Sequence, residues 1–105
     1  MLDLSPRQLD ILRAILARHV PGREVRAFGS RVTGRAWRYS DLDLVVMGDE
    51  PLPDLVRANL VADLEESDLP FRVDLIEAPD LPASRTAGFE ARSEPISRPA
   101  EAAEP

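Results

Sequence analysis

The stretch Phe28–Val46, with the sequence FGSRVTGRAWRYSDLDLVV, decides the fold of this chain and points to its chemistry. A Gly29-Ser30 pair is followed, after a short basic segment, by Asp41 and Asp43 at the head of an apolar run. Residues i and i+2 of a strand point to the same face, so we expect the two carboxylates to lie side by side. Paired carboxylates repel each other unless a cation lies between them, and hard oxygen ligands suit magnesium. The pattern therefore indicates metal-assisted transfer of a nucleotidyl group.

The composition limits the fold and the function classes. At 105 residues the chain is expected to form one domain, and it contains no cysteine, which excludes disulfides and thiolate chemistry. All 13 basic residues are arginine, and the absence of lysine excludes a covalent lysyl-nucleotide intermediate and a Walker A loop. The net charge of −6 argues against general nucleic-acid binding but permits a basic partner. No apolar run approaches the roughly 20 residues that span a bilayer, and we expect a cytoplasmic protein.

The pattern of apolar and turn-forming residues predicts two long helices and three strands. Ser5 can cap the first helix, because Gln8 follows three residues later and Pro6 suits the first helical turn. Apolar residues then recur every three or four positions, as in an amphipathic helix. The predicted helices are Pro6–His19 and Pro53 to about Ser67. The predicted strands are Val25–Phe28, Asp41–Met47 and Phe71–Ile76.

These elements predict an α+β fold in which a small mixed β-sheet carries helices on one face. Alternation along the central strand places Leu42, Leu44 and Val46 on one face and the aspartates on the other. We expect both helices to pack on the face away from the aspartates. The domain is predicted to span residues 1–91. Residues 92–105, rich in proline, serine, glutamate and alanine, are predicted to form a disordered tail.

The sequence resembles a known superfamily in the spacing of its motif residues, which are Gly29-Ser30, then Asp41 and Asp43, and then Asp74 on a later strand. This spacing is similar to that of the DNA polymerase β-like nucleotidyltransferases. Within them the chain most resembles the minimal nucleotidyltransferase (MNT) proteins, which are antitoxin partners of HEPN-domain toxins. The resemblance covers about residues 5–90 and is carried by FGSRVTGR, SDLDLVV and LPFRVDLI.

The resemblance implies roles for the acidic residues. Asp41 and Asp43 would hold two magnesium ions that bridge the phosphates of ATP during an in-line displacement. Asp74 would bind the second metal and help to deprotonate the attacking hydroxyl. Each residue also has a structural interpretation, because Asp41 can cap a turn and Asp74 can pair with Arg72. Asp43 lies inside an apolar run, where a carboxylate is costly unless it is paired or metal-bound.

The resemblance also assigns the nucleotide-binding residues. The amide groups of Gly29-Ser30 would form an anion site for the triphosphate, although this pair could serve only as a helix cap. Arg31 or Arg35 could steady the triphosphate. The aromatic pair Trp37 and Tyr39 is interpreted as packing over the loop rather than as stacking on a base.

The predicted function is transfer of AMP from ATP to a hydroxyl. In the resembled family the partner is a HEPN RNase toxin, which the antitoxin inactivates by adenylylating a tyrosine or by binding. Two alternatives stay open at this point: a binding-only antitoxin without turnover, and a small-molecule nucleotidyltransferase of the antibiotic-modifying type. For a transfer reaction we expect the acceptor surface to come from a partner or from a second copy of the chain.

Overall fold

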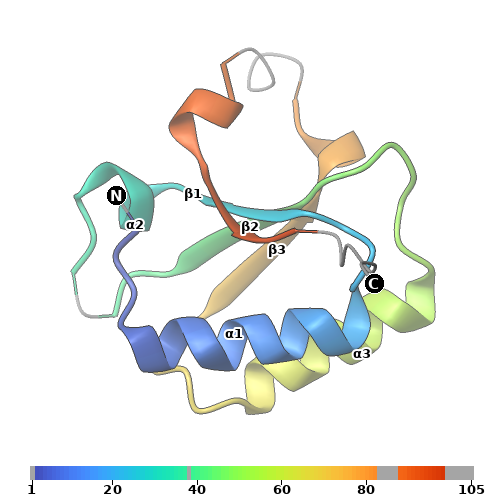
Figure 1. Cartoon of the computed structure of the whole chain (residues 1–105), viewed down its shortest axis with the longest axis horizontal. Helices are drawn as coiled ribbons and strands as arrows, with labels where there is room; N and C mark the ends of the chain where they lie inside the picture. Colours follow the sequence, from blue (N-terminus) through green and yellow to red (C-terminus); the bar gives the residue numbers. More distant parts are fainter. Residues whose placement is uncertain (1, 38, 83–87, 99–105) are drawn as a thin grey trace, which may run out of the picture.

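The fold is a small mixed sheet covered by two helices, and the computed structural model describes residues 2–37, 39–82 and 88–98. Within these ranges the sheet order is β3-β2-β1-β4 (Figure 1). Strand β1 is antiparallel to β2 and β4, whereas β2 is parallel to β3. The predicted α+β fold is confirmed. In chain order the elements are α1 (Pro6–His19), β1 (Val25–Phe28), α2 (Ser30–Thr33), β2 (Leu42–Val46), α3 (Asp54–Glu66), β3 (Val73–Glu77), the short 3-10 helices η1 (Ala78–Asp80) and η2 (Glu90–Arg92), and β4 (Glu94–Ser97).

Helix α1 begins and ends at the predicted residues. The Ser5 hydroxyl accepts a hydrogen bond from the Gln8 amide at 3.1 Å, and the Gln8 side chain accepts one from the Ser5 amide at 3.0 Å. This reciprocal cap satisfies two amides that the first helical turn leaves without partners. Helix α3 matches its prediction within one residue at each end, because Pro53 and Ser67 are its flanking cap residues.

The two faces of the sheet differ as the sequence predicts. Leu42, Leu44 and Val46 are fully buried and belong to the core that α1 and α3 complete. Figure 1 shows both helices on this one face of the sheet. The opposite face carries Asp43 and, from β3, Asp74. The helices therefore supply stability, through burial of apolar area, without covering the acidic residues.

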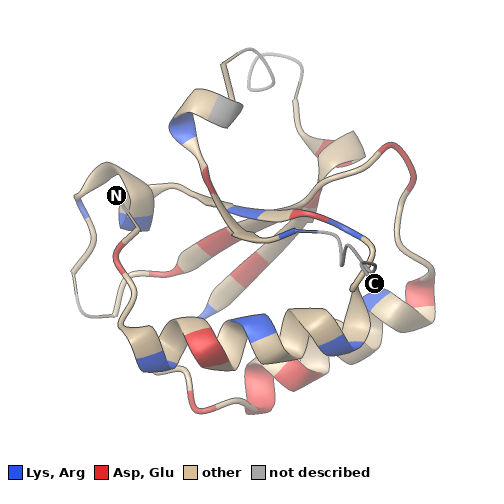
Figure 2. Ribbon diagram, in the orientation of Figure 1, with Lys and Arg blue, Asp and Glu red and all other residues tan. Residues whose placement is uncertain are grey.

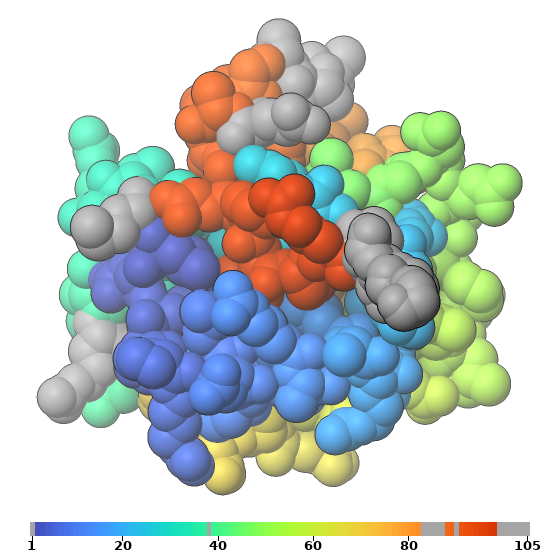
Figure 3. Space-filling model, viewed as in Figure 1, coloured from blue at the N-terminus to red at the C-terminus, as the bar shows by residue number. Residues whose placement is uncertain are grey.

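Strand β4 corrects the prediction of a disordered tail beginning at Arg92. Residues 94–97 pair with β1, and Ile96 is almost fully buried in the core. The Arg13 guanidinium of α1 donates to the Ile96 carbonyl at 2.9 Å, and Figure 3 shows this strand lying against α1. Pro95 obscured the strand because proline cannot donate a ladder hydrogen bond, but it is tolerated at the edge of a sheet, where β4 lies. Residues 99–105 of the predicted tail are outside the described residues.

Strand β3 starts two residues later than predicted. Its parallel pairing begins with Val73 opposite Leu42, and the preceding Phe71 is buried beside the strand rather than within it. At the other end Glu77 is buried, and its carboxylate accepts hydrogen bonds from the Leu52 amide at 2.5 Å and from Arg57 at 2.8 Å. This contact fixes the start of α3 to the end of β3.

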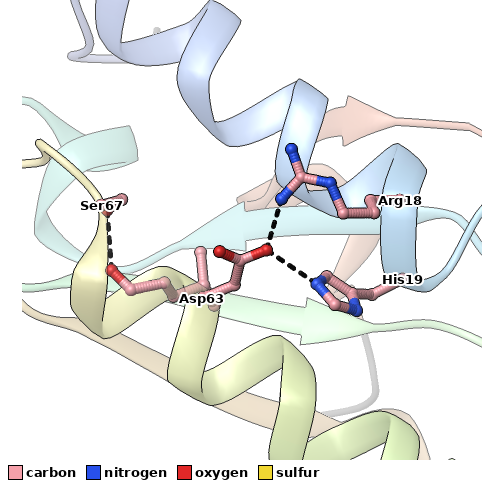
Figure 4. A network of polar contacts seen from close by, with 5 residues as sticks. Arg18, His19, Asp63 and Ser67 are labelled. Carbon is pink, nitrogen blue, oxygen red and sulfur yellow. Dashed lines mark hydrogen bonds and ion pairs between the residues drawn. The ribbon is translucent and has the colours of Figure 1, made fainter.

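A polar network joins α1 to α3 on the surface (Figure 4). The Asp63 carboxylate lies 2.8 Å from the His19 ring nitrogen and 2.5 Å from an Arg18 nitrogen. The hydrogen bond with His19 is the main cause that lowers the pKa of Asp63, and Arg18 lowers it further against the opposing effect of burial. His19 thus connects the last turn of α1 to α3.

Candidate active site

The turn after β1 and the carboxylate of β2 are in direct contact. Gly29 has a φ of +83°, a conformation that residues with a side chain rarely adopt. A Cβ added at Gly29 would also overlap the Asp43 carboxylate. Two separate constraints therefore require glycine at this position. The contact brings together the two halves of the sequence motif, which are fourteen positions apart along the chain.

Two of the predicted acidic residues, Asp43 and Asp74, are neighbours on the open face of the sheet. Asp43 is paired with Phe28 across β1 and with Asp74 across β3, so all three side chains share one face. Figure 2 shows the acidic positions of β2 and β3 next to each other. Asp41 is exposed and precedes β2 by one residue. The structure thus brings Asp43, Asp74 and Gly29 together, with Asp41 two residues before Asp43.

Arg72 is the cation beside these carboxylates. Its guanidinium contacts one oxygen of Asp74 through two nitrogens, at 3.0 Å and 2.9 Å. The hydrogen bond to Asp74 raises the pKa of Arg72, and the negative charges of Asp74 and Asp41 raise it further. The pairing of Asp74 with Arg72, considered from the sequence as a structural alternative, is therefore present. Arg72 is exposed, so it can leave this position without unpacking the core.

The carboxylates of Asp41, Asp43 and Asp74 are chemically suited to a divalent cation, because carboxylate oxygens are the ligands that magnesium prefers. Within residues 2–37, 39–82 and 88–98, however, no three acidic or histidine side chains are grouped closely enough to hold a metal ion. Asp74 would have to exchange Arg72 for the metal. The predicted metal-binding role of the three aspartates stays a prediction.

Arg31 has a setting that the sequence did not reveal. Its side chain is only 4% exposed, and its guanidinium donates to the carbonyls of Ser40 and Asp3, both at 2.9 Å. The same group lies 4.0 Å above the centre of the Phe71 ring. Arg31 thus holds the loop that leads to Asp41 against the body of the domain. Its predicted contact with the triphosphate stays a prediction, and that contact would compete with these hydrogen bonds.

The loop between α2 and β2 presents aromatic side chains to solvent. Trp37 and Tyr39 are 69% and 54% exposed, and their rings form an edge-to-face pair 6.2 Å apart. The Trp37 amide donates to the Ser40 hydroxyl at 3.0 Å, and the Ser40 amide donates to the Trp37 carbonyl at 2.9 Å. These bonds give the loop a defined turn immediately before Asp41. Arg35, the other predicted triphosphate ligand, is exposed in this loop.

Two pockets adjoin the acidic face. One of about 570 Å³ lies between α3 and β3 and includes Arg72 and Asp74 in its wall. The other, of about 220 Å³, is lined by Phe28, Gly29, Thr33, Phe89 and Arg92. The sequence did not point to Phe89 and Arg92 as site residues. Helix and strand patterns are weak after Pro79, and these residues reach Gly29 only because the chain returns toward β1 through β4.

Comparisons with known proteins identify the family of the chain. A family model described as a nucleotidyltransferase domain matches residues 9–96. The chain belongs to this nucleotidyltransferase family. A Haemophilus influenzae relative described as "Probable protein adenylyltransferase MntA" is 50% identical over 76 residues, which are 72% of this chain and 67% of that protein. The predicted resemblance to minimal nucleotidyltransferases is thereby confirmed.

Solved structures of nucleotidyltransferases share the fold. One, a toxin–antitoxin structure with AMP-PNP, has 22% identity and a TM-score of 0.68, and the match covers 86% of this chain and 73% of that chain. Another describes a tri-AMPylated Shewanella oneidensis HEPN toxin in complex with an MNT antitoxin. It has 21% identity and a TM-score of 0.61, and the match covers 86% of this chain and 69% of that chain. At these identities the likeness establishes that the fold is shared. Among the described residues, no helix is both long enough and apolar enough to cross a membrane.

Proposed function

We propose that this chain is an antitoxin that transfers AMP from ATP to a tyrosine hydroxyl of a cognate HEPN-domain RNase toxin and so neutralises it. The observation that carries the proposal is the packing of Asp43 against Gly29, beside Asp74 on the next strand. The 50% identical relative, described as a probable protein adenylyltransferase, supports a protein acceptor. The solved complex of an MNT antitoxin with an AMPylated HEPN toxin supports the kind of partner.

The Gly29-Ser30 turn is the proposed triphosphate site. Gly29 has no side chain, so the main chain can approach a phosphate closely. The amides of the turn and the Ser30 hydroxyl are hydrogen-bond donors of the kind that bind anions. The adjacent Asp43 would repel the phosphates unless a cation neutralised both.

The proposed cation is magnesium, held by Asp41, Asp43 and Asp74. When bound, it would neutralise the negative charge that the phosphates carry during an in-line displacement. For Asp74 to bind the metal, the Arg72 guanidinium must move away from the Asp74 oxygen that it contacts. Arg72 is 74% exposed, so this movement breaks only a surface ion pair, whose net stability is small.

The transfer forms one bond and breaks another. The acceptor hydroxyl oxygen bonds to the α-phosphorus of ATP, the bond from that phosphorus to the bridging oxygen breaks, and pyrophosphate leaves. Asp74 accepts the hydroxyl proton. The partner must bring its hydroxyl to about 3 Å from the α-phosphorus for efficient transfer. The wall of the larger pocket, which contains Asp74, is the side from which the acceptor would enter.

The proposal is tested by mixing the full chain with its cognate toxin, ATP and magnesium, and measuring the toxin by mass spectrometry. The wild-type chain should add AMP to a toxin tyrosine. Asp43→Asn should reduce the rate by several orders of magnitude, and the double variant with Asp41→Asn should be little slower, because both residues serve one step. Asp68→Asn is a matched control, because Asp68 is exposed and lies outside the site.

Magnesium dependence is measured in the same reaction by adding a chelator and then restoring the metal. The rate should fall and recover. Neutralisation of an unmodified toxin by the Asp43→Asn protein would instead favour a binding-only antitoxin. Transfer to small hydroxyl compounds in the absence of any toxin modification would favour the small-molecule enzyme.

A further inference from the structure

The smaller pocket lies on the same face of the sheet as the catalytic aspartates. Along β1, Val25 and Ala27 are fully buried in the helix-covered core, so the residues that alternate with them point the other way. Phe28 is one of these residues, and it is paired across the strands with Asp43. The Phe28 ring and the Asp43 carboxylate therefore project from neighbouring strands toward the same side.

The pocket continues directly from the proposed triphosphate turn. Gly29 belongs to the turn and also to the pocket wall, and Thr33 of α2 lines the same wall. The volume of about 220 Å³ is smaller than the roughly 300–1,000 Å³ of a site that encloses a whole ligand. The pocket is therefore of a size for one part of a ligand whose remainder lies over Gly29 and Asp43.

The walls of the pocket suit a flat aromatic group. The Phe28 and Phe89 rings meet edge to face, with centroids 5.6 Å apart and planes at 64°. Together the two rings form an apolar, aromatic wall, in which Phe28 is partly exposed and Phe89 is buried behind it. Arg92 adds a guanidinium, which can donate hydrogen bonds to ring nitrogens or stack on a π face.

We propose that this pocket binds the nucleobase of the nucleotide substrate, with the Phe28 and Phe89 rings as its aromatic wall. The inference rests on the proposed function, because it takes the triphosphate to lie at Gly29-Ser30. The ribose joins the base to the phosphates, so the base must lie in a space that borders the phosphate site. The pocket meets that requirement on the aspartate face. The exposed Trp37 ring, on the loop beyond α2, is the rival platform.

The test compares two ligands on the full-length protein by calorimetry in the presence of magnesium. ATP carries a base, whereas inorganic tripolyphosphate does not. Phe89→Ala should weaken ATP binding about fivefold or more, the low end of the effect of removing one aromatic ring from a stacked base. Tripolyphosphate binding should stay within twofold of wild type. Trp37→Ala, which removes the rival ring, should leave both affinities unchanged.

Two further variants keep the test decisive. Phe89 is only 6% exposed, so Phe89→Leu retains most of its apolar volume while removing the ring. Its melting temperature is measured alongside the affinities, and it should show the same selective loss of ATP binding. Arg92→Ala should also lower the affinity for ATP more than that for tripolyphosphate.

Equal losses for both ligands in the folded Phe89→Leu protein would overturn the inference, because the residue would then act only on the phosphate turn. A selective loss of ATP binding in Trp37→Ala but not in Phe89→Leu would also overturn it. If wild type bound tripolyphosphate as tightly as ATP, the base subsite would be refuted while the proposed transfer stayed intact. If wild type bound neither ligand, the proposed function would fail as well.

Discussion

Replacing Arg31 with methionine separates two roles that this residue could play. The guanidinium donates to two main-chain carbonyls at 2.9 Å and lies over the Phe71 ring at 4.0 Å. Methionine keeps an unbranched apolar side chain that can still contact the ring, but it donates no hydrogen bond. If Arg31 mainly holds the loop, the variant should lose stability and only secondarily lose activity.

The expected loss of stability follows from these contacts. Each hydrogen bond contributes about 1 kcal/mol net, and the cation over the ring adds about 1 kcal/mol. The free energy of unfolding should therefore fall by roughly 3 kcal/mol. For a domain of this size each kcal/mol lowers the melting temperature by about 4–8 °C, so the shift should be about 12–24 °C. Thermal unfolding followed by circular dichroism measures it.

A matched variant completes this experiment. Arg35 is also an arginine of the loop but is exposed, so Arg35→Met should leave the melting temperature within about 4 °C of wild type, as is usual for surface substitutions. ATP affinity is measured for both proteins under conditions where they are folded. An Arg31→Met protein that melts like wild type but binds ATP weakly would refute the reasoning and assign Arg31 to the triphosphate.

Other parts of the fold give further predictions. Gly29→Val should destabilise the protein by about 2 kcal/mol in urea unfolding and abolish ATP binding in calorimetry, because the turn is left-handed and the new side chain overlaps the Asp43 carboxylate. Glu77→Ala should cost about 2 kcal/mol in the same unfolding assay, because the Leu52 amide loses its acceptor and Arg57 keeps only the Leu75 carbonyl, whereas Glu77→Gln should cost less. The lowered pKa of Asp63 means that its stabilising contribution is present above its ordinary value of 3.8 and is lost as the pH falls through the folded value. The difference in melting temperature between wild type and Asp63→Asn should therefore be positive at pH 7 and should shrink below about pH 4.

The parts of the fold that sequence predicted well depend on local interactions. Helix α1 was predicted to the residue because Ser5 and Gln8 form a cap within four positions of each other. The buried and open faces of β2 were predicted correctly because side chains alternate between the two faces along a strand. In both cases the signal and the structure it specifies lie within one segment of the chain.

The parts that were missed depend on contacts between distant segments. Strand β4 is stabilised by pairing with β1 and by the Arg13 contact, and neither can be inferred from its proline-containing sequence. Arg31 is buried because carbonyls from two loops converge on it, which no spacing encodes. The pocket beside Gly29 has the same origin, since Phe89 reaches Phe28 only when the chain returns along the edge of the sheet.

The order of the strands has a consequence for how such a protein can diversify. The contact between Gly29 and Asp43 lies within one antiparallel pair, β1 and β2, and is encoded by a single continuous segment. Asp74 arrives separately, on a parallel strand connected through α3. The segment proposed to hold the triphosphate and the strand proposed to face the acceptor are thus separate parts of the chain. On the proposed function, substitutions along β3 and α3 would change which hydroxyl is modified while the proposed triphosphate segment keeps its sequence.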